Sequence, residues 1–344
     1  MRAARVVLVA ALALIAAPAW GGIALWDDYL VLSGFASVSA AKSDNATPLY
    51  IHRRFDDDWC FDCDTTVGLQ LDSQLSESWR ASAQVVKRPQ DTFSDPQFEW
   101  GYLGWQLTDN LQARGGRLRL PLFVASEYYY VGNGYPWARP PIDVYGTMLG
   151  ITSFNGLDLL YNYSLGDELE LQLHPFYGGH NHEKVDFGPS TLKVETKVQT
   201  GVSVKLHGAR FLLNFTYFYA DFELDDEPDS LDVFSLGGRY EFVQWELWAE
   251  FERDKLQQAA YVAAAWNLDS WQPYVMVSQA WKRLESTSYI AGVRYNWLPN
   301  LSVNLEYQLA DARNGSSGQF TLPPQTLGEP TEANLVTLML SYNF

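Results

Sequence analysis

The chain has 344 residues, a formal net charge of −17, and an aromatic content of 15%. A chain this acidic lacks the basic surface that nucleic-acid binding requires, so we expect no nucleic-acid partner. Mean hydropathy is slightly negative, at −0.18, and no segment after the first twenty residues has the length of a membrane helix. A helical membrane protein is therefore disfavoured, whereas strands that turn only alternate residues toward lipid remain compatible with this composition.

The first segment has the pattern of a secretory signal peptide. Arg2 and Arg5 form a basic start, residues 6–17 are apolar without a break, and Ala17-Pro18-Ala19 supplies a small-x-small cleavage motif. We expect cleavage after Ala19, which leaves residues 20–344 as one domain. An uncleaved membrane anchor is the alternative, but the apolar run is too short to span a bilayer.

Period-two alternation of apolar and polar residues runs through most of the remaining chain, and no convincing amphipathic helix interrupts it. The predicted strands are 29–40, 67–72, 79–85, 97–107, 111–120, 145–164, 168–178, 193–207, 209–222, 231–242, 244–253, 258–268, 271–282, 287–297, 300–311 and 332–344.

Residues 145–164 decide whether the strand count is even. The stretch Ser153-Phe154-Asn155-Gly156 resembles a turn, and a turn there would make the count odd and move every later long loop to the side of the short turns. Bacterial single-chain barrels have an even number of strands, with short turns on one side. We therefore predict one long strand, bent or bulged near Asn155-Gly156.

The predicted links then separate by length, which supports an all-β, transmembrane antiparallel β-barrel of sixteen strands in the bacterial outer membrane. The short links, expected on the periplasmic side, are 76–78, 108–110, 165–167, 207–209 and 298–300. The long links, expected outside, are 41–63, 88–96, 121–144, 179–192, 223–230 and 312–331. The aromatic residues (13 Trp, 20 Tyr and 18 Phe) suit the girdles that mark both membrane interfaces.

Cys60 and Cys63, the two cysteines of the chain, form a C-x-x-C pair flanked by carboxylates. Behind a signal peptide the oxidising periplasm favours a disulfide that pins a loop. A metal site remains the alternative, and a thioredoxin-like role is disfavoured because no βαβ pattern surrounds the pair.

The last strand alternates to its final residue. Its outward set is Val336, Leu338, Leu340, Tyr342 and Phe344. This pattern resembles the closing strand of outer-membrane β-barrels, whose terminal Phe is read by the barrel-assembly machinery. The resemblance implies that Tyr342 and Phe344 are part of an assembly signal.

The segment after the fifth predicted strand is the candidate filter. Gly116-Arg117 leads into a loop rich in Gly, Pro and aromatic residues, and a sixteen-stranded barrel is wide enough for a water-filled channel. Together with the closing strand, this arrangement resembles the Gram-negative general porin family, in which a third loop folds into the lumen and forms a constriction. The Pro-Trp-x-Arg-Pro-Pro stretch of 136–141 departs from the best-known porins, which leaves ion preference open.

A porin constriction works by opposed charge, with loop carboxylates facing basic side chains on the wall. The residues that we predict for it are Arg80, Arg117, Arg119, Glu127, Arg139, Asp143 and Arg294. Lumen-facing charges can also be solvated lining without a specific role. The loop aromatics either pack the loop against the wall, which we favour, or stack on sugar rings.

We therefore expect a passive diffusion channel for small hydrophilic solutes and ions. A substrate-selective channel, for a sugar or an anion, is the alternative. A non-conducting barrel and an enzymatic barrel are less favoured, since no histidine lies in a recognisable nucleophile motif and G-x-S-x-G is absent from the sequence. We expect no cofactor. The expected partners are outer-membrane lipid, lipopolysaccharide, the barrel-assembly machinery and, from the family resemblance, two further copies in a homotrimer.

Overall fold

The computed structural model describes residues 22–26, 29–89, 96–146, 152–186 and 191–344. The predicted signal peptide, residues 1–19, lies outside the described residues. Among the residues described, no helix combines the length and apolar character needed to cross a membrane.

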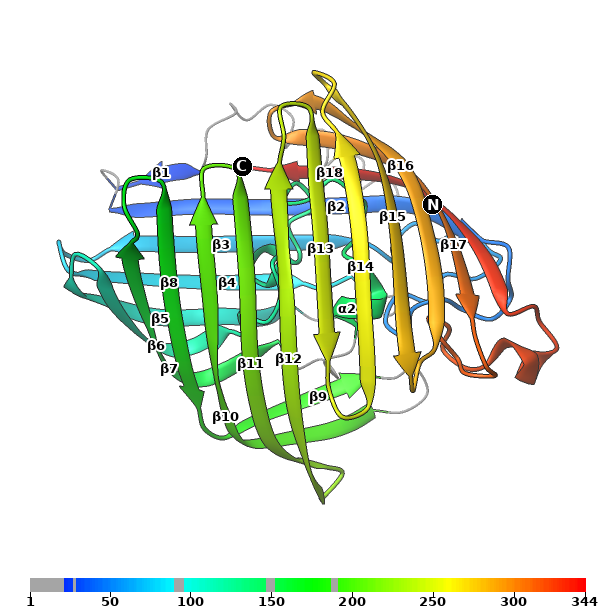
Figure 1. Cartoon of the computed structure of the whole chain (residues 1–344), viewed down its shortest axis with the longest axis horizontal. Helices are drawn as coiled ribbons and strands as arrows, with labels where there is room; N and C mark the ends of the chain where they lie inside the picture. The colour runs from blue at the N-terminus through cyan, green and yellow to red at the C-terminus, as the bar shows by residue number, and fades with distance from the viewer. Residues whose placement is uncertain (1–21, 27–28, 90–95, 147–151, 187–190) are drawn as a thin grey trace.

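Strands account for most of the described chain and join into one antiparallel sheet that closes on itself (Figure 1). The strands of the closed ring are β2 (Leu30–Ser43), β3 (Thr66–Gln74), β4 (Trp79–Lys87), β5 (Gln97–Thr108), β6 (Leu111–Arg119), β7 (Ser153–Ser164), β8 (Leu169–Gly178), β10 (Thr191–Gly208), β11 (Phe211–Leu224), β12 (Glu227–Glu241), β13 (Trp245–Arg253), β14 (Gln257–Trp266), β15 (Trp271–Lys282), β16 (Ser286–Leu298), β17 (Leu301–Ala312) and β18 (Glu332–Asn343). In the described residues the ring thus has sixteen strands, as the alternation predicts.

The first and last strands of the ring close it. β18 pairs with β2 from Leu335–Ser43 to Asn343–Phe35, and Figure 1 shows the two strands side by side. The backbones of Gly34 and Phe344 then exchange two hydrogen bonds of 2.9 and 3.0 Å. Closure leaves no strand edge unpaired in the ring, which is what a hydrocarbon environment demands of a sheet.

Two short strands lie outside the ring. β1 (Ile23–Leu25) pairs with the start of β2, and β9 (Asn181–Asp186) pairs with the start of β10 beyond the barrel. Neither was predicted from the sequence, because three apolar residues next to a signal peptide and a polar stretch inside a predicted loop carry little alternation.

Three details of the predicted elements are wrong. Tyr145 does not begin a strand but ends the short helix α2 (Ile142–Tyr145), and β7 begins at Ser153. β7 keeps one register with β6 through Asn155 and Gly156, so no bulge lies there. The long link predicted at 223–230 is a tight turn at Asp225 and Asp226, whose φ angles of 50° and 72° fit a type I′ hairpin.

The outer face of the barrel is apolar and the inner face is mainly polar. Exposed outward residues such as Leu69, Val262 and Leu338 alternate with inward residues such as Gln70, Tyr261 and Thr337. At the ends of the strands near the short turns, outward tryptophans stack in cross-strand pairs. These pairs are Trp79–Trp105 at 5.3 Å and Trp245–Trp266 at 5.4 Å between ring centroids. The apolar outer face is called the apolar belt here. The belt and the tryptophan pairs at its edge match the lipid-facing surface of transmembrane barrels.

Candidate functional site: the third loop and the inner wall

The long link between β6 and β7, residues 120–152, is called loop 3 here; residues 147–151 of it lie outside the described residues. The described part of loop 3 contains the 3-10 turn η1 (Ser126–Tyr128) and the helix α2. Figure 1 draws α2 within the ring of strands, and α2 contacts β13, β14 and β15. Hydrogen bonds along most of the length of loop 3 hold it against the inner wall of the barrel.

The start of loop 3 is fastened to β11 and β13. The carbonyl of Pro121 accepts a hydrogen bond from Thr216 at 2.9 Å, and the amide of Val124 donates to Glu250 at 2.8 Å. Glu250 also accepts hydrogen bonds from Tyr261, at 2.7 Å, and from Tyr145 at the end of α2. One buried carboxylate therefore joins the two ends of loop 3 to the wall.

The middle of loop 3 is fastened to β16 and β17. Arg294 donates to the carbonyl oxygens of Gly132, at 3.0 Å, and Tyr135, at 2.7 Å. The amide of Ala138 donates to Glu306 at 2.9 Å. Because every one of these bonds ends on a backbone group of the loop, the wall fixes the path of the chain and not only its side chains.

Arg139 and Asp143 attach loop 3 to β15, β16 and β18 and to the two loops that contain Asp64 and Gln319. Arg139 donates to Asp64 at 2.7 and 3.1 Å and to Thr337 on β18 at 2.8 Å. Asp143 accepts hydrogen bonds from Ser286 on β16, at 2.6 Å, from Ser278 on β15, and from Gln319 in the last loop, at 2.8 Å. Arg139 and Asp143 are both almost fully buried. They act in this structure as anchors of loop 3.

Burial alone would raise the pKa of Asp64, but the guanidinium groups of Arg139 and Arg53 outweigh it and hold that pKa at about 2. Arg53 lies 3.3 Å from the carboxylate. The ionised form of Asp64 is therefore the one that the fold stabilises.

The aromatic residues of loop 3 divide into a packed group and a group beside the basic wall. Trp137 is 2% exposed and meets Trp248 at 5.3 Å and Tyr261 at 6.0 Å between ring centroids. Tyr130 lies 4.9 Å under the guanidinium of Arg119. The first group packs loop 3 on β13 and β14, and the second leaves aromatic rings on the side of β4 and β6.

The inner wall on that side carries basic residues. Arg80 on β4 and Arg114 on β6 lie over the same ring, Tyr102, at 5.8 and 5.2 Å from its centroid. Arg114 also forms two hydrogen bonds with the buried carboxylate of Asp158, at 2.5 and 2.9 Å. His174 lies 2.7 Å from the same carboxylate. Arg114 was not among the predicted residues, although it lies two positions after the inward Gln112 and therefore on the same face of β6.

Glu127 of loop 3 faces this wall. Its carboxylate lies 3.8 Å from Lys205 on β10, and the charge of Lys205 lowers the pKa of Glu127. Glu127 is therefore an acidic group that loop 3 presents to basic residues of the wall.

The remaining predicted arginines differ from one another. Arg119 donates to Glu99 at 2.6 Å and to the carbonyl of Ser126 at 2.8 Å, so it fastens the start of loop 3. Arg117 donates to Asn181 at the start of β9, at 3.3 Å. Of the seven predicted residues, Arg119, Arg139, Asp143 and Arg294 hold loop 3. Glu127 faces Lys205 on β10, and Arg80 lies on β4 beside Gln112 and Tyr102.

Cys60 and Cys63 are joined in a disulfide. Their sulfurs and a carboxylate oxygen of Asp62 lie within 4.8 Å of one another, the one such group of possible metal ligands found in the described part of the chain. Sulfurs bonded to each other are not thiolate ligands, so this group does not offer the donor set of a cysteine metal site.

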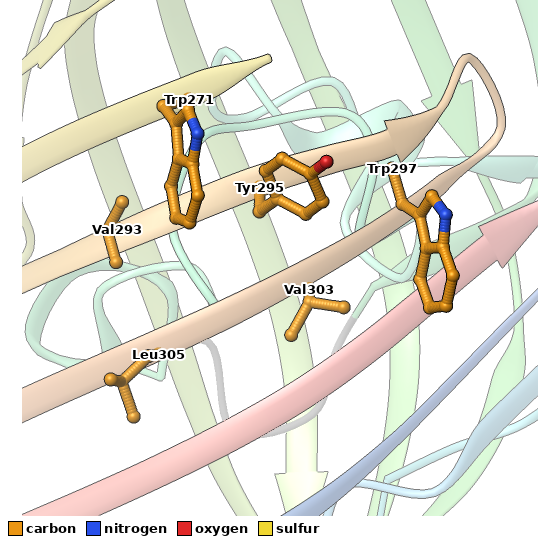
Figure 2. A pocket seen from close by; sticks show the side chains of 6 residues that line it. All are labelled: Trp271, Val293, Tyr295, Trp297, Val303 and Leu305. Atoms are coloured by element: carbon orange, nitrogen blue, oxygen red, sulfur yellow. The ribbon is translucent and has the colours of Figure 1, made fainter.

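The hollow in Figure 2 lies on the outer face and is not part of the lumen. Its lining comes from β15, β16 and β17 and consists of Trp271, Val293, Tyr295, Trp297, Val303 and Leu305. These residues alternate with the inward Arg294 and Asn304, and Trp271 and Trp297 are exposed. The hollow thus belongs to the aromatic edge of the apolar belt.

No protein-family model matches the sequence, and neither does any curated protein. Solved structures match the fold over nearly the whole chain. The chain is similar to OmpF of Salmonella typhi in complex with daunomycin (TM-score 0.61, 14% identity, 94% of this chain and 100% of that one). It is similar to an anion-selective porin from Comamonas acidovorans (TM-score 0.62, 10% identity, 92% and 99%). It is also similar to in-vitro folded OmpT, an outer membrane protein of Vibrio cholerae, in its trimer form (TM-score 0.57, 12% identity, 92% and 99%).

Identities this low establish fold and nothing finer. Together with the closed ring and the apolar outer belt, they show that the chain has the porin-like fold of a multi-pass β-barrel of the bacterial outer membrane.

Proposed function

We propose that the protein is an outer-membrane porin, a passive diffusion channel for small hydrophilic solutes and ions in which loop 3 forms the constriction. The observation that carries the proposal is the fastening of loop 3 to β11, β13 and β15–β18 by buried side chains. A loop held to that half of the ring narrows the lumen and leaves the wall of β4–β8 and β10 as the side along which solutes pass.

The charges on the two sides of this passage favour a selective filter. Glu127 on loop 3 stands opposite Lys205, and Arg80 and Arg114 line the wall beside it. Opposed charges across a narrow aqueous passage set up a transverse field that acts on the charge and dipole of a solute. We place the constriction at these residues. Arg117 is not among them, because it pairs with the exposed Asn155 of β7 and so lies on the other face of β6 from Arg114, which pairs with the buried Asp158.

Single-channel recording in a planar bilayer tests the proposal. The folded protein should insert in discrete conductance steps. Arg80→Ala should move the reversal potential across a salt gradient toward cation preference, because it removes a lumen charge. The matched control is Arg253→Ala on the outer face, which should not shift the reversal potential. Silent bilayers from correctly folded protein would contradict the channel.

An anion-preferring channel is the second candidate, and one observation favours it. In the part of the chain that the structure describes, Arg80 makes no ion pair; its guanidinium donates to the amide oxygen of Gln112 at 2.7 Å. A charge that no carboxylate neutralises attracts anions. A chloride-selective reversal potential in the parent, lost in Arg80→Ala, would support this candidate.

We also propose that the protein works as a homotrimer without catalytic activity or cofactor, in contact with membrane lipid and lipopolysaccharide. The trimer form of the OmpT structure supports the oligomeric part of this proposal. Cross-linking of the detergent-solubilised protein should give a species of three chains, and a monomer at all protein concentrations would contradict it. Lipase and protease assays should show no activity.

A further inference from the structure

The first long loop, residues 44–65, is called loop 1 here, and part of it returns to pair with the edge of β2 beyond the end of β3. The backbones of Cys60 and Ala41 exchange hydrogen bonds of 2.8 and 2.9 Å. Four residues later, Asp64 accepts a hydrogen bond from Ser39 at 2.7 Å. The Cys60–Cys63 disulfide lies between these two attachments, so it restricts the short stretch that presents Asp64.

Asp64 in turn joins loop 1 to loop 3. Its carboxylate is 1% exposed and receives two hydrogen bonds from Arg139, while Arg53 lies 3.3 Å away. Arg139 also lies 3.5 Å from Glu306 and 4.7 Å over the ring of Phe55. A buried carboxylate and a buried guanidinium stabilise each other only while their geometry is kept, since a charge left without its partner in the interior is costly.

Because of these contacts, a displacement of Asp64 would displace Arg139 or break the ion pair between them. We propose that the Cys60–Cys63 disulfide positions Asp64, that Asp64 clamps loop 3 through Arg139, and that reduction of the disulfide loosens the clamp and widens the channel. The inference rests on the proposed function, because it assigns loop 1 a role in setting the width of the same constriction. Asp64 and the two cysteines are positioning residues and do not line the passage in this proposal.

The chemical step is an exchange with an added dithiol. The dithiol reduces the S–S bond, which breaks as two cysteine S–H groups form, and the dithiol itself becomes a cyclic disulfide. No bond in loop 3 is broken, so a change in loop 3 must pass through loop 1.

The test is a set of recordings on the folded, full-length protein in a planar bilayer. Dithiothreitol added to the parent should raise the single-channel conductance, and the paired variant Cys60→Ser with Cys63→Ser should have the higher value without reductant and ignore it. Asp64→Asn should also raise conductance. Combined with the cysteine variant it should add nothing further, because both changes act through one contact.

Hydrogen exchange supplies a readout that does not depend on conduction. Peptides covering 132–140 contain the Ala138 amide that donates to Glu306, and they should exchange faster after reduction. Peptides covering β14 serve as the internal control and should not change. If complete reduction, verified by thiol labelling, alters neither conductance nor exchange at 132–140, the inference is wrong. A silent parent whose loop 3 exchange still responds to reductant would remove the channel function and leave the clamp.

Discussion

Gly156 shows how strictly a single position in the wall can be set. It lies in β7 opposite Gly178 of β8 and Gly116 of β6. A Cβ atom at Gly156 would come within 2.0 Å of the carbonyl oxygen of Tyr177 and 2.7 Å of the Cα of Gly178. Since both are backbone atoms, no side-chain rotation relieves the contact, and the strands would have to separate.

We therefore expect Gly156→Ala to destabilise the barrel by roughly 1–3 kcal/mol, the cost typical of an overpacked interior. The temperature at which the detergent-solubilised barrel loses its heat-resistant gel mobility should fall. Gly179→Ala is the matched control, because an added Cβ there meets no atom within 4 Å. Equal melting of the two variants would argue against the close backbone approach.

Asp64 gives a second prediction at the scale of a residue, based on pH. Its pKa of about 2 in the folded chain is below the value of 3.8 for a free aspartate, so its ionised form contributes stability above about pH 4. That contribution, roughly 2–3 kcal/mol at about 1.4 kcal/mol per pKa unit, is lost as pH falls through the folded pKa. Urea unfolding of the parent should weaken between pH 4 and pH 2.

Asp64→Asn removes the titrating group and serves as the comparison for that experiment. The variant should lose less stability than the parent over the same acid range, because the asparagine side chain does not titrate. Parallel acid profiles for the two proteins would show that other carboxylates account for the loss.

At the scale of the element, loop 3 depends on Glu250 more than on its own secondary structure. In its described residues, loop 3 has one 3-10 turn and one helix of four residues, which are too short to hold a shape alone. Glu250 accepts hydrogen bonds from Val124, Tyr261 and Tyr145, and it is 3% exposed. Replacing it would leave those donors buried without an acceptor.

We expect Glu250→Ala to increase open-channel noise and to lower the free energy of unfolding by about 1–3 kcal/mol for each donor left unsatisfied. Glu252→Ala is the control on the same strand, since Glu252 is buried but makes no hydrogen bond to any described residue. Quiet channels in Glu250→Ala would show that the other anchors, such as Arg294, suffice to hold loop 3.

At the scale of the whole molecule, alternation predicted the ring because it is a local property of each strand. The sixteen strands, their order and the closing pair follow from period-two patterns such as that of 332–344. Alternation could not predict the structure of segments whose conformation depends on contacts with residues distant in the sequence. Tyr145 continued an apolar pattern and was assigned to a strand, yet contacts with Glu250 and Phe123 place it at the end of a helix.

The same limit applies to the candidate site. The sequence identified the charged residues of the third loop and of the neighbouring wall, but it could not assign them to separate roles. In the sequence, Arg139 and Asp143 are charged loop residues like those that line a pore. They are anchors because Asp64 and Gln319, which are distant in the sequence, lie beside them in the fold. Arg114 was not predicted, because its carboxylate partner Asp158 lies on the neighbouring strand β7 and is 44 positions away in the sequence.

Phe344 takes part in closing the ring and is also a residue of the proposed assembly signal. Phe344 donates its amide hydrogen to Gly34 at 2.9 Å and accepts one back at 3.0 Å, so it extends the ladder that closes the ring. Its ring lies close enough to Gly34 that a Cβ there would come within 2.7 Å. Deleting Phe344 removes two hydrogen bonds from one end of a long ladder. We expect that loss to be small beside the whole barrel, with the purified protein still refolding from urea into detergent.

Inside cells the same deletion should have a larger effect if Tyr342 and Phe344 form a signal for the assembly machinery. The heat-modifiable protein in outer-membrane fractions should fall, while refolding in detergent is retained. Phe344→Tyr, which keeps an aromatic ring and the backbone bonds, is the control and should assemble normally. If deletion impairs refolding in detergent as much as assembly in cells, the last residue acts through closure of the sheet, and a role as a signal is unnecessary.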